Sequence, residues 1–315
     1  MIGKAPNVYR IGEGKEPLRV AVVGCGGAGC NSLKYVPGNL GIETFALNGD
    51  PRKGLGKLAK RSVVVPDHEL LAASDTDPRI DIAPHVRSAG ALSLELAGQQ
   101  AVFPVCGLGG DSGWRCAALA ARTARETGAL AVCTVILPFS AEAPARRKAA
   151  LEQAATLRRF CDGIVVLHNE RILAMAPKLP FMRAMEVVSE LALLVPSELA
   201  AAASSSDVQP LKELFARSGH LAADVASIPA GGEPSDLAEA LVGSEWMSVA
   251  PRSVSAGLVL VGGNAGGDAT EDVAREFRSS LPNLEVLVFG ESGRSREAGK
   301  SLRACAILGV AGELR

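Results

Sequence analysis

The sequence predicts a two-domain α/β protein whose larger domain is a parallel β-sheet with helices on both faces. Short apolar runs alternate with helix-length segments along most of the chain. The runs are continuously apolar, which is typical of strands that are buried on both faces of a parallel sheet. The chain's 315 residues also exceed the size at which a single hydrophobic core usually stops growing, so two domains are expected.

The first part of the chain supplies the elements of the parallel sheet. We expect strands at residues 18–23, 43–47, 62–65, 101–106, 130–137 and 164–167, and helices near residues 29–36, 85–97, 116–127 and 145–160. The connectors between these segments are short. The polar and glycine-rich motifs all follow the carboxyl ends of predicted strands, which is where such sheets bind ligands.

The second part of the chain changes character after an apolar segment, residues 181–203, that we interpret as a buried connecting helix. Beyond it we expect strands at 223–228, 256–261, 284–289 and 303–310, and helices near 209–218, 234–243 and 268–280. The predicted organisation is a flexible, Gly-, Lys- and Pro-rich arm at 1–17, the parallel-sheet domain at 18–180, the connecting helix at 181–203, and a smaller domain at 204–315.

Composition excludes several classes of function. Lys plus Arg total 33 and Asp plus Glu total 34, so the basic excess of a nucleic-acid-binding protein is absent. The 7 cysteines are scattered, and neither they nor the histidines stand at metal-ligand spacing, so we predict no metal site from them and a reduced, cytoplasmic protein. No apolar run reaches the length of a membrane span, so no direct membrane insertion is expected.

Two glycine-rich segments, GCGGAG at 24–29 and GLGGDSG at 107–113, each follow a predicted strand and precede a predicted helix. Glycine lets a phosphate approach backbone amides at such a position. The alternative interpretation is a tight turn that only packs a helix against the sheet. Two such bends at one sheet edge suggest one phosphate chain held from two sides. An NAD-dependent enzyme would need one bend and an acid such as Asp50, and it leaves the second bend unexplained.

Five motifs occur in the order, and at close to the spacing, of the nucleotide loops of FtsZ. They are GCGGAGCN at 24–31, NGD at 48–50, GLGGDSG at 107–113, PFSAEAPARR at 138–147 and LHNERIL at 167–173. The similarity continues through SDVQPL at 206–211 and SAGLVLVGGNAGGDATEDV at 255–273. The sequence thus resembles the tubulin/FtsZ superfamily, which implies a Rossmann-like nucleotide-binding domain joined by a central helix to a smaller α+β domain.

The resemblance implies a guanine-nucleotide site that holds GTP or GDP. It assigns phosphate contacts to Gly26, Gly27, Ala28 and Asn31 in the first bend and to Gly109, Gly110, Ser112 and Gly113 in the second. It assigns the ribose to Glu142, with Arg146 nearby, and the guanine base to Asn169 and Glu186. Plainer readings stay open, since Glu142 and Arg146 have the spacing of a helical ion pair and Asn169 suits a turn.

The sequence also departs from the family pattern around the phosphates. Asp111 places a carboxylate where phosphate oxygens would lie, and the bulky Trp114 and Arg115 replace small residues, which we expect to obstruct the close approach. Arg115 pairing with phosphate is the weaker alternative. Residues 71–78 (LAASDTDP) correspond to a further phosphate loop but lack glycine and add acidity. Either Mg²⁺ uses this acidity, or the triphosphate is disfavoured against the diphosphate or an empty pocket.

The family's catalytic loop carries an Asn and two Asp, and here Ala202, Ser204 and Asp207 stand at those positions. Because one of the two acids is lost, hydrolysis should be slow or absent, and the chain is at most a slow GTPase. The resemblance implies head-to-tail association with itself or with a typical FtsZ. The alternative is a nucleotide-free pseudo-GTPase that serves as a protein interaction scaffold.

Overall fold

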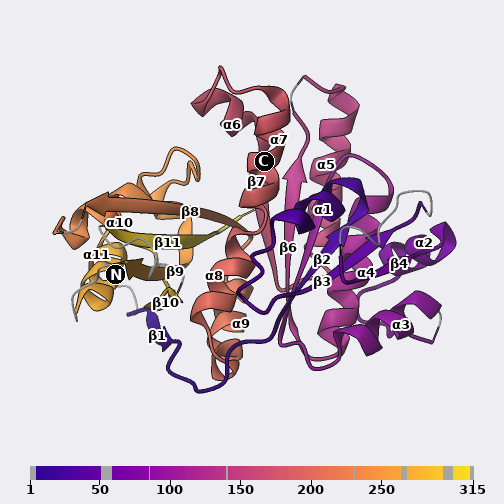
Figure 1. Ribbon diagram of the computed structural model, residues 1–315, viewed down its shortest axis with the longest axis horizontal. Helices are drawn as coiled ribbons and strands as arrows, with labels where there is room; N and C mark the ends of the chain where they lie inside the picture. Colours follow the sequence, from indigo (N-terminus) through magenta and orange to yellow (C-terminus); the bar gives the residue numbers. More distant parts are fainter. Residues whose placement is uncertain are drawn as a thin grey trace. The chain divides into compact units, whose positions relative to one another are not determined.

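The structure is a computed structural model and describes residues 5–50, 59–84, 86–139, 141–229, 231–263, 268–293 and 301–312. The chain divides into two compact units. The first, the parallel-sheet unit, comprises Arg19–Pro196. The second, the mixed-sheet unit, comprises Met1–Leu18 together with Ser197–Glu313. Figure 1 shows the elements of both units coloured along the sequence.

The parallel-sheet unit contains the strands that the apolar runs predict. They are β2 (Val20–Cys25), β3 (Glu43–Asn48), β4 (Arg61–Val64), β5 (Ala101–Gly107), β6 (Leu130–Leu137) and β7 (Gly163–His168). Their order across the sheet is β7-β6-β5-β2-β3-β4, and each neighbouring pair is parallel. The prediction of an α/β fold with a parallel sheet is therefore confirmed.

The helices of this unit follow the strands in the expected alternation. They are α1 (Gly26–Ser32), α2 (Asp67–Asp75), α3 (Arg87–Leu96), α4 (Ser112–Glu126), α5 (Pro144–Leu157), α6 (Asn169–Met175) and α7 (Phe181–Leu191). Helix α4 is buried along most of its length, because its many alanines let it pack closely on the sheet. Residues of α2, α3, α4 and α5 share one core with alternate residues of β2.

The strand order places a topological switch point between β2 and β5. From β2 the chain runs to its neighbour β3 and then to β4, and it returns to β5 on the other side of β2 before continuing to β6 and β7. Open parallel sheets bind ligands outside the carboxyl ends of strands at such a point. Both glycine bends lie there, since one follows β2 and the other follows β5.

The mixed-sheet unit is built on β1 (Asn7–Ile11), β8 (His220–Pro229), β9 (Val254–Gly263), β10 (Val286–Glu291) and β11 (Ser301–Val310). Their order is β1-β10-β9-β11-β8. Strand β11 is antiparallel to β8 and β9, whereas β10 is parallel to both β9 and β1. The helices α9 (Val208–Ala216), α10 (Pro234–Val242) and α11 (Ala269–Ser279) complete this unit, which agrees with the α+β character predicted for it.

The N-terminal segment differs from the flexible arm predicted for residues 1–17. Strand β1 pairs with β10 over five residues, and both Asn7 Nδ2 and the Tyr9 hydroxyl donate to the carboxylate of Glu213 on α9, at 2.7 and 2.6 Å. Surrounding Gly, Lys and Pro residues hid this short strand in the sequence. For residues 7–11 the prediction of a flexible arm is wrong.

The segment 181–203 is two helices rather than the single connecting helix predicted. Helix α7 ends at Leu191, a turn follows at Ala192 and Leu193, and α8 spans Leu194–Ala202. Pro196 explains the break, because it has no N–H to donate to the carbonyl of residue 192 and its ring would clash with that carbonyl. In the first turn of α8 the same proline is tolerated.

Candidate functional site

The two glycine bends of the parallel-sheet unit lie directly against each other. Gly26 has a left-handed backbone (φ 68°), and a Cβ at that position would stand 2.7 Å from the Cα of Gly113. A Cβ on Gly107 would stand 2.9 Å from the Cβ of Ala28. Because Gly26 and Gly113 carry no side chains, the backbone of one bend reaches the backbone of the other.

The second bend leads into the N-terminus of α4, a helix of 15 residues that begins at Ser112. Asp111, which precedes it, makes no side-chain hydrogen bond to the helix, and the first turn contains no acidic residue. The first amides of a helix lack partners within the helix and carry the positive end of its dipole. The space around Gly110 is also open, since a Cβ there would meet nothing within 4 Å. This arrangement can accept an anion.

One amide of the second bend already has a partner. Gly109 N donates to Gln153 Oε1 at 2.7 Å, and Gln153 Nε2 donates to the carbonyl oxygen of Gly110 at 3.1 Å. Gly109, a predicted phosphate contact, is thus tied to α5. Nothing in the sequence motifs pointed to Gln153, because its role depends on a contact between distant parts of the chain.

Glu142 and Arg146 form the ion pair that their spacing suggested, with Arg146 Nη1 and Glu142 Oε2 2.8 Å apart. Glu142 also accepts a hydrogen bond from Phe139 N at 2.9 Å, so its carboxylate fixes the chain before α5. Arg146 lies beside the second bend, since a Cβ on Gly109 would be 2.5 Å from Arg146 Cγ. The left-handed φ of Gly109 (83°) further explains the glycine there.

Two buried asparagines lie at the carboxyl ends of strands, Asn48 as the last residue of β3 and Asn169 directly after β7, and each carries a side-chain atom without a hydrogen-bond partner among the described residues. Asn169 begins α6 directly after β7 and is 4% exposed, and its Oδ1 has no partner among the described residues. Asn48 ends β3 and is 1% exposed; its Oδ1 accepts from Asp50 N at 3.2 Å, but its Nδ2 has no described partner. Buried polar atoms are normally paired, so both atoms indicate a missing hydrogen-bonding group.

The remaining predicted contacts lie on exposed or half-buried positions. Gly27 and Asn31 are exposed and Ala28 is half-buried in α1, which packs against α7. Glu186 lies on α7 and pairs with Arg183 at 2.8 Å, with both side chains near half exposure. The described contacts connect Glu186 with its own helix and give it no bond to either bend.

Trp114 does not obstruct the start of α4 as expected. Trp114 is buried in the core, and the Arg115 guanidinium lies over its ring at 4.6 Å from the centroid. Arg115 also donates to Ser74 Oγ and to Asp75 Oδ1, the latter at 2.9 Å. The hydrogen bond from the Ser74 hydroxyl and the pairing with Arg115 lower the pKa of Asp75. The expectation of a steric block by Trp114 is therefore wrong.

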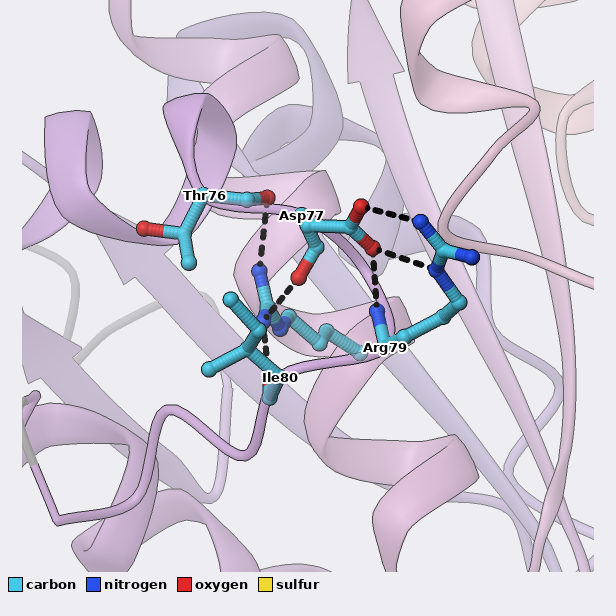
Figure 2. Close-up of polar contacts among 5 residues, drawn as sticks. Thr76, Asp77, Arg79 and Ile80 are labelled. Atoms are coloured by element: carbon cyan, nitrogen blue, oxygen red, sulfur yellow. Dashed lines mark hydrogen bonds and ion pairs between the residues drawn. The ribbon is translucent and has the colours of Figure 1, made fainter.

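Arg122 of α4 is the centre of a hydrogen-bond cluster that the motifs did not reveal. It is 2% exposed and donates to four backbone carbonyls, those of Ala73 (3.1 Å), Thr76 (3.2 Å), Asp77 (2.8 Å) and Ile80. Figure 2 shows the carbonyls of Thr76, Asp77 and Ile80 converging on this guanidinium. Desolvation by burial lowers the pKa of Arg122.

These contacts define residues 71–78, the segment that corresponds to a further phosphate loop of the family. Residues up to Asp75 belong to α2, and the following turn is held on α4 by Arg122. The Asp77 carboxylate turns away from the cluster toward Arg79 (Figure 2), whose hydrogen bonds lower the pKa of Asp77. Arg79 Nη2 and Asp77 Oδ2 are 2.7 Å apart.

The two predicted catalytic residues lie in the mixed-sheet unit and bond to each other. Asp207 Oδ2 accepts from Ser204 N (2.7 Å), Ser204 Oγ (2.7 Å) and Gly12 N (2.9 Å). Asp207 is 6% exposed, and Ser204 and Asp207 form a capping box at the start of a short helix. The N-terminal segment adds bonds from Ser205 N to Glu16 O and from Leu18 N to Ala203 O, while Ala202 ends α8.

An Mg²⁺ ion that accompanied a nucleotide would need oxygen ligands at this site. Within the described residues no group of three or more His, Cys, Asp or Glu side chains is placed to hold a metal ion. Mg²⁺ is often held by one or two carboxylates together with substrate phosphates, and Asp67 and Asp111 line one pocket at the start of α4.

All 7 cysteines are buried thiols. In the described part of the chain, none of the helices could cross a bilayer.

Comparison with known proteins gives a consistent relationship. The family model "Tubulin/FtsZ family, GTPase domain" matches residues 85–177. Cell division protein FtsZ 1 of Pyrococcus furiosus is 36% identical over 177 residues, which are 55% of this chain and 47% of that protein. Cell division protein FtsZ 1 of Methanocaldococcus jannaschii is 29% identical over 67% of this chain and 56% of its own length. The matched region thus spans about half the length of these relatives.

Solved structures share the fold over nearly the whole chain. An empty FtsZ dimer of M. jannaschii has a TM-score of 0.76 at 22% identity, covering 93% of this chain and 88% of that one. CetZ2 of Haloferax volcanii, as a GTPγS-bound protofilament, has a TM-score of 0.72 at 19% identity and covers 95% of both chains. Sequence motifs, family match and fold agree in relating this chain to the FtsZ-like proteins of the tubulin/FtsZ superfamily.

Proposed function

We propose that this chain is a cytoskeletal protein of the cytoplasm that binds guanine nucleotide, GTP or GDP, at the two glycine bends. In this proposal it hydrolyses GTP slowly or not at all and associates head to tail with itself or with a typical FtsZ. Neither nucleic acid nor membrane insertion has a part in it. The contact between Gly26 and Gly113 is the observation that carries the proposal.

That contact matters because it occurs at the topological switch point between β2 and β5. A phosphate chain lying over the bends would meet backbone amides from two strand ends at once, together with the positive end of α4. A dinucleotide enzyme needs a single bend, so the second bend favours a mononucleotide with several phosphates. Gly110 and Ser112 supply the open part of this surface.

Recognition of a purine base is supported by Asn169. Its buried Oδ1 accepts no hydrogen bond from the described residues, and guanine carries N–H donors on its Watson–Crick edge. An unpaired acceptor at this depth costs about 1–3 kcal/mol, so a ligand that donates to it gains that amount. Glu142, Arg146 and Glu186 remain proposed ribose and base contacts, and they would have to exchange their present ion pairs for the ligand.

Slow or absent hydrolysis is supported by the state of the catalytic loop. A general base needs an oxygen that can accept a proton from water within hydrogen-bond reach. Asp207 Oδ2 already accepts three hydrogen bonds and is buried, and Ser204 donates two of them. The one surviving carboxylate therefore stabilises its own unit, and Ser204 has no charge to contribute.

Self-association is proposed by similarity. The related structures are an FtsZ dimer and a CetZ2 protofilament, and this chain shares their fold. The curated relatives are cell division proteins, of which the match covers about half. We infer that this chain forms or joins the same kind of linear assembly.

A second candidate function, a nucleotide-free pseudo-GTPase that serves as an interaction scaffold, is favoured by one specific observation. Gln153 occupies the amide of Gly109 and the carbonyl of Gly110, so the second bend is partly closed without a ligand. Asp111 adds a carboxylate at the same place. In that case the fold would bind proteins and no nucleotide.

Calorimetric titration of the purified chain with GDP, GTP and ATP separates the two functions. The decisive variant is Gly110→Ala, because the added methyl group meets no protein atom within 4 Å and would stand only in the path of a phosphate. Gly90→Ala is the matched control, since it also adds a methyl group in open space but lies on α3. Neither substitution should lower thermal stability.

We expect guanine nucleotide to bind the wild type and Gly90→Ala equally, ATP to bind neither, and Gly110→Ala to lose at least about tenfold in affinity, or 1.4 kcal/mol. Silence for all nucleotides would replace the first function with the scaffold. Unchanged binding by Gly110→Ala would show that the ligand lies elsewhere.

A further inference from the structure

A charged pocket of about 260 Å³ lies at the start of α4, between this helix and α2. It is lined by Asp67, Leu70, Leu71, Asp111, Ser112 and Arg115. A Cβ on Gly49 would lie 3.3 Å from Asp67 Oδ1 and 3.7 Å from Ser112 Cβ, which places the end of β3 at the same spot. Directly before Gly49 stands Asn48, whose buried Nδ2 has no described partner.

The positive charge of this pocket is already engaged. Arg115 pairs with Asp75 Oδ1 at 2.9 Å, donates to Ser74 Oγ and stacks on Trp114. Asp67 and Asp111 form no ion pair with Arg115, whose described carboxylate partner is Asp75. The pocket thus presents two carboxylates, while its one arginine is turned toward the end of α2.

Helix α2, which forms one wall of the pocket, is held in place by Arg122 of α4. Arg122 donates to the carbonyl of Ala73 at the end of α2. It also donates to the carbonyls of Thr76, Asp77 and Ile80 in the following turn (Figure 2). Four bonds from one buried guanidinium oppose any movement of this segment toward or away from the bends. The acidic wall therefore cannot open to make room for a further phosphate without breaking this cluster.

We propose that the site selects a guanine nucleoside diphosphate over the triphosphate, with Asp67 and Asp111 as the specificity-determining residues. The inference rests on the proposed nucleotide site at the two bends. A third phosphate extending from the bends past Ser112 would bring its charge next to both carboxylates, and Arg115 is held away by Asp75. Like charges a few ångströms apart near a protein surface lower affinity by about tenfold or more.

It follows that the nucleotide bound to this chain would not indicate whether GTP had been hydrolysed. A triphosphate would be excluded by charge, and the segment that would have to move around its last phosphate is fixed by Arg122. The chain would then be loaded with diphosphate whatever assembly it joins.

The test compares GDP and GTP binding to the full chain by calorimetry, first in EDTA and then with Mg²⁺. The variants are Asp111→Asn and Asp67→Asn, each of which removes one charge at nearly constant size, and Asp75→Ala, which releases Arg115 toward the pocket. Asp75 is the last residue of α2, where an acid is unfavourable to the helix dipole, so this variant should fold. Glu43→Gln is the control, because Glu43 is the first residue of β3 and the pocket adjoins the last residues of that strand.

We expect the wild type and Glu43→Gln to bind GDP at least tenfold more tightly than GTP in EDTA. Each of the other three variants should gain GTP affinity by about tenfold while GDP affinity changes less. Equal or tighter binding of GTP by the wild type in EDTA would overturn the inference and leave the nucleotide site standing. A preference for GTP that appears with Mg²⁺ would also overturn it, because the carboxylates would then hold a metal ion. Absence of any binding would overturn both proposals.

Discussion

At the scale of single residues, the site is marked by buried polar atoms that the protein leaves unpaired. Asn48 Nδ2 and Asn169 Oδ1 are the clearest cases; Asn48 ends β3, and Asn169 directly follows β7. Each costs the desolvation of a polar group without the compensating bond, about 1–3 kcal/mol. The opposite case is Asp207, whose carboxylate accepts three bonds and so stabilises the fold.

Asn169→Ala should therefore affect binding more than stability. The substitution removes an acceptor that has no protein partner, so we expect a small change in the free energy of unfolding, below about 1.5 kcal/mol. Guanine affinity should fall by about tenfold, measured by titration with GDP, and selectivity against ATP should shrink with it. An equal loss of stability and binding would mean that Asn169 only holds α6 to the sheet.

Asp207→Ala should have the reverse effect. Loss of the capping box and of the bond to Gly12 N should destabilise the chain by about 2 kcal/mol in urea unfolding. Phosphate release from GTP, already slow or absent, should not change. Glu239→Ala, an exposed substitution on α10, controls for general effects on the mixed-sheet unit. A clear fall in phosphate release without destabilisation would show that Asp207 is catalytic.

At the scale of elements, α2 and the turn that follows it depend on one side chain of α4. Arg122 donates to the carbonyl of Ala73 in the last turn of α2 and to the carbonyls of Thr76 and Asp77 beyond it. Its aliphatic part and guanidinium lie near Phe160, 5.7 Å from the ring centroid, so that packing and hydrogen bonding act together. These contacts hold the segment that corresponds to a phosphate loop of the family against α4.

Arg122→Met should lower the free energy of unfolding by about 3 kcal/mol, because several carbonyls lose their donor while the buried volume is roughly kept. Arg122→Lys should recover part of this loss, since an ammonium cannot reach four carbonyls at once. Urea unfolding measures both changes. Arg125→Met, on the same helix but half exposed, is the control. Similar unfolding midpoints for Arg122→Met and Arg125→Met would refute the role of the cluster.

The docking of β1 should depend on pH through Glu213. Hydrogen bonds from Tyr9 and then Asn7 lower the pKa of Glu213 below its ordinary value of 4.5. A lowered pKa means that this stabilisation is present above the unfolded-state pKa and is lost as the pH falls through the folded-state value. We expect amides of residues 7–11 to exchange faster below pH 4.5 in the wild type. In Glu213→Gln this pH dependence should vanish; its persistence would place the switch elsewhere.

Most elements could be predicted from the sequence, and the failures have identifiable causes. Continuous apolar runs predicted the strands, since burial on both faces leaves few polar positions. Strand β1 was missed because its five residues are flanked by Gly and Pro. The break between α7 and α8 is encoded by Pro196, which cannot donate a hydrogen bond to the carbonyl of residue 192. The fixed turn after α2 depends on Arg122, about 45 residues away, which no local pattern reveals.

At the scale of the whole molecule, the order of motifs predicted which strand ends would meet but not what their side chains would do. In the sheet β2 and β5 are neighbours on either side of the switch point, so the bends that follow them lie together. Side-chain partners such as Gln153 on Gly109 and Asp75 on Arg115 arise only from packing of α5 and α2 on that frame. These contacts distinguish the site of this chain from the site that the motifs alone predict.

The central claim is that both glycine bends hold one guanine nucleotide, and amide hydrogen exchange with and without GDP tests it most directly. We predict slower exchange in the presence of GDP for residues 26–28 and 110–113 together, and at Asn169. Protection confined to the first bend, as a dinucleotide would give, or no protection in either bend at saturating GDP, would contradict the account.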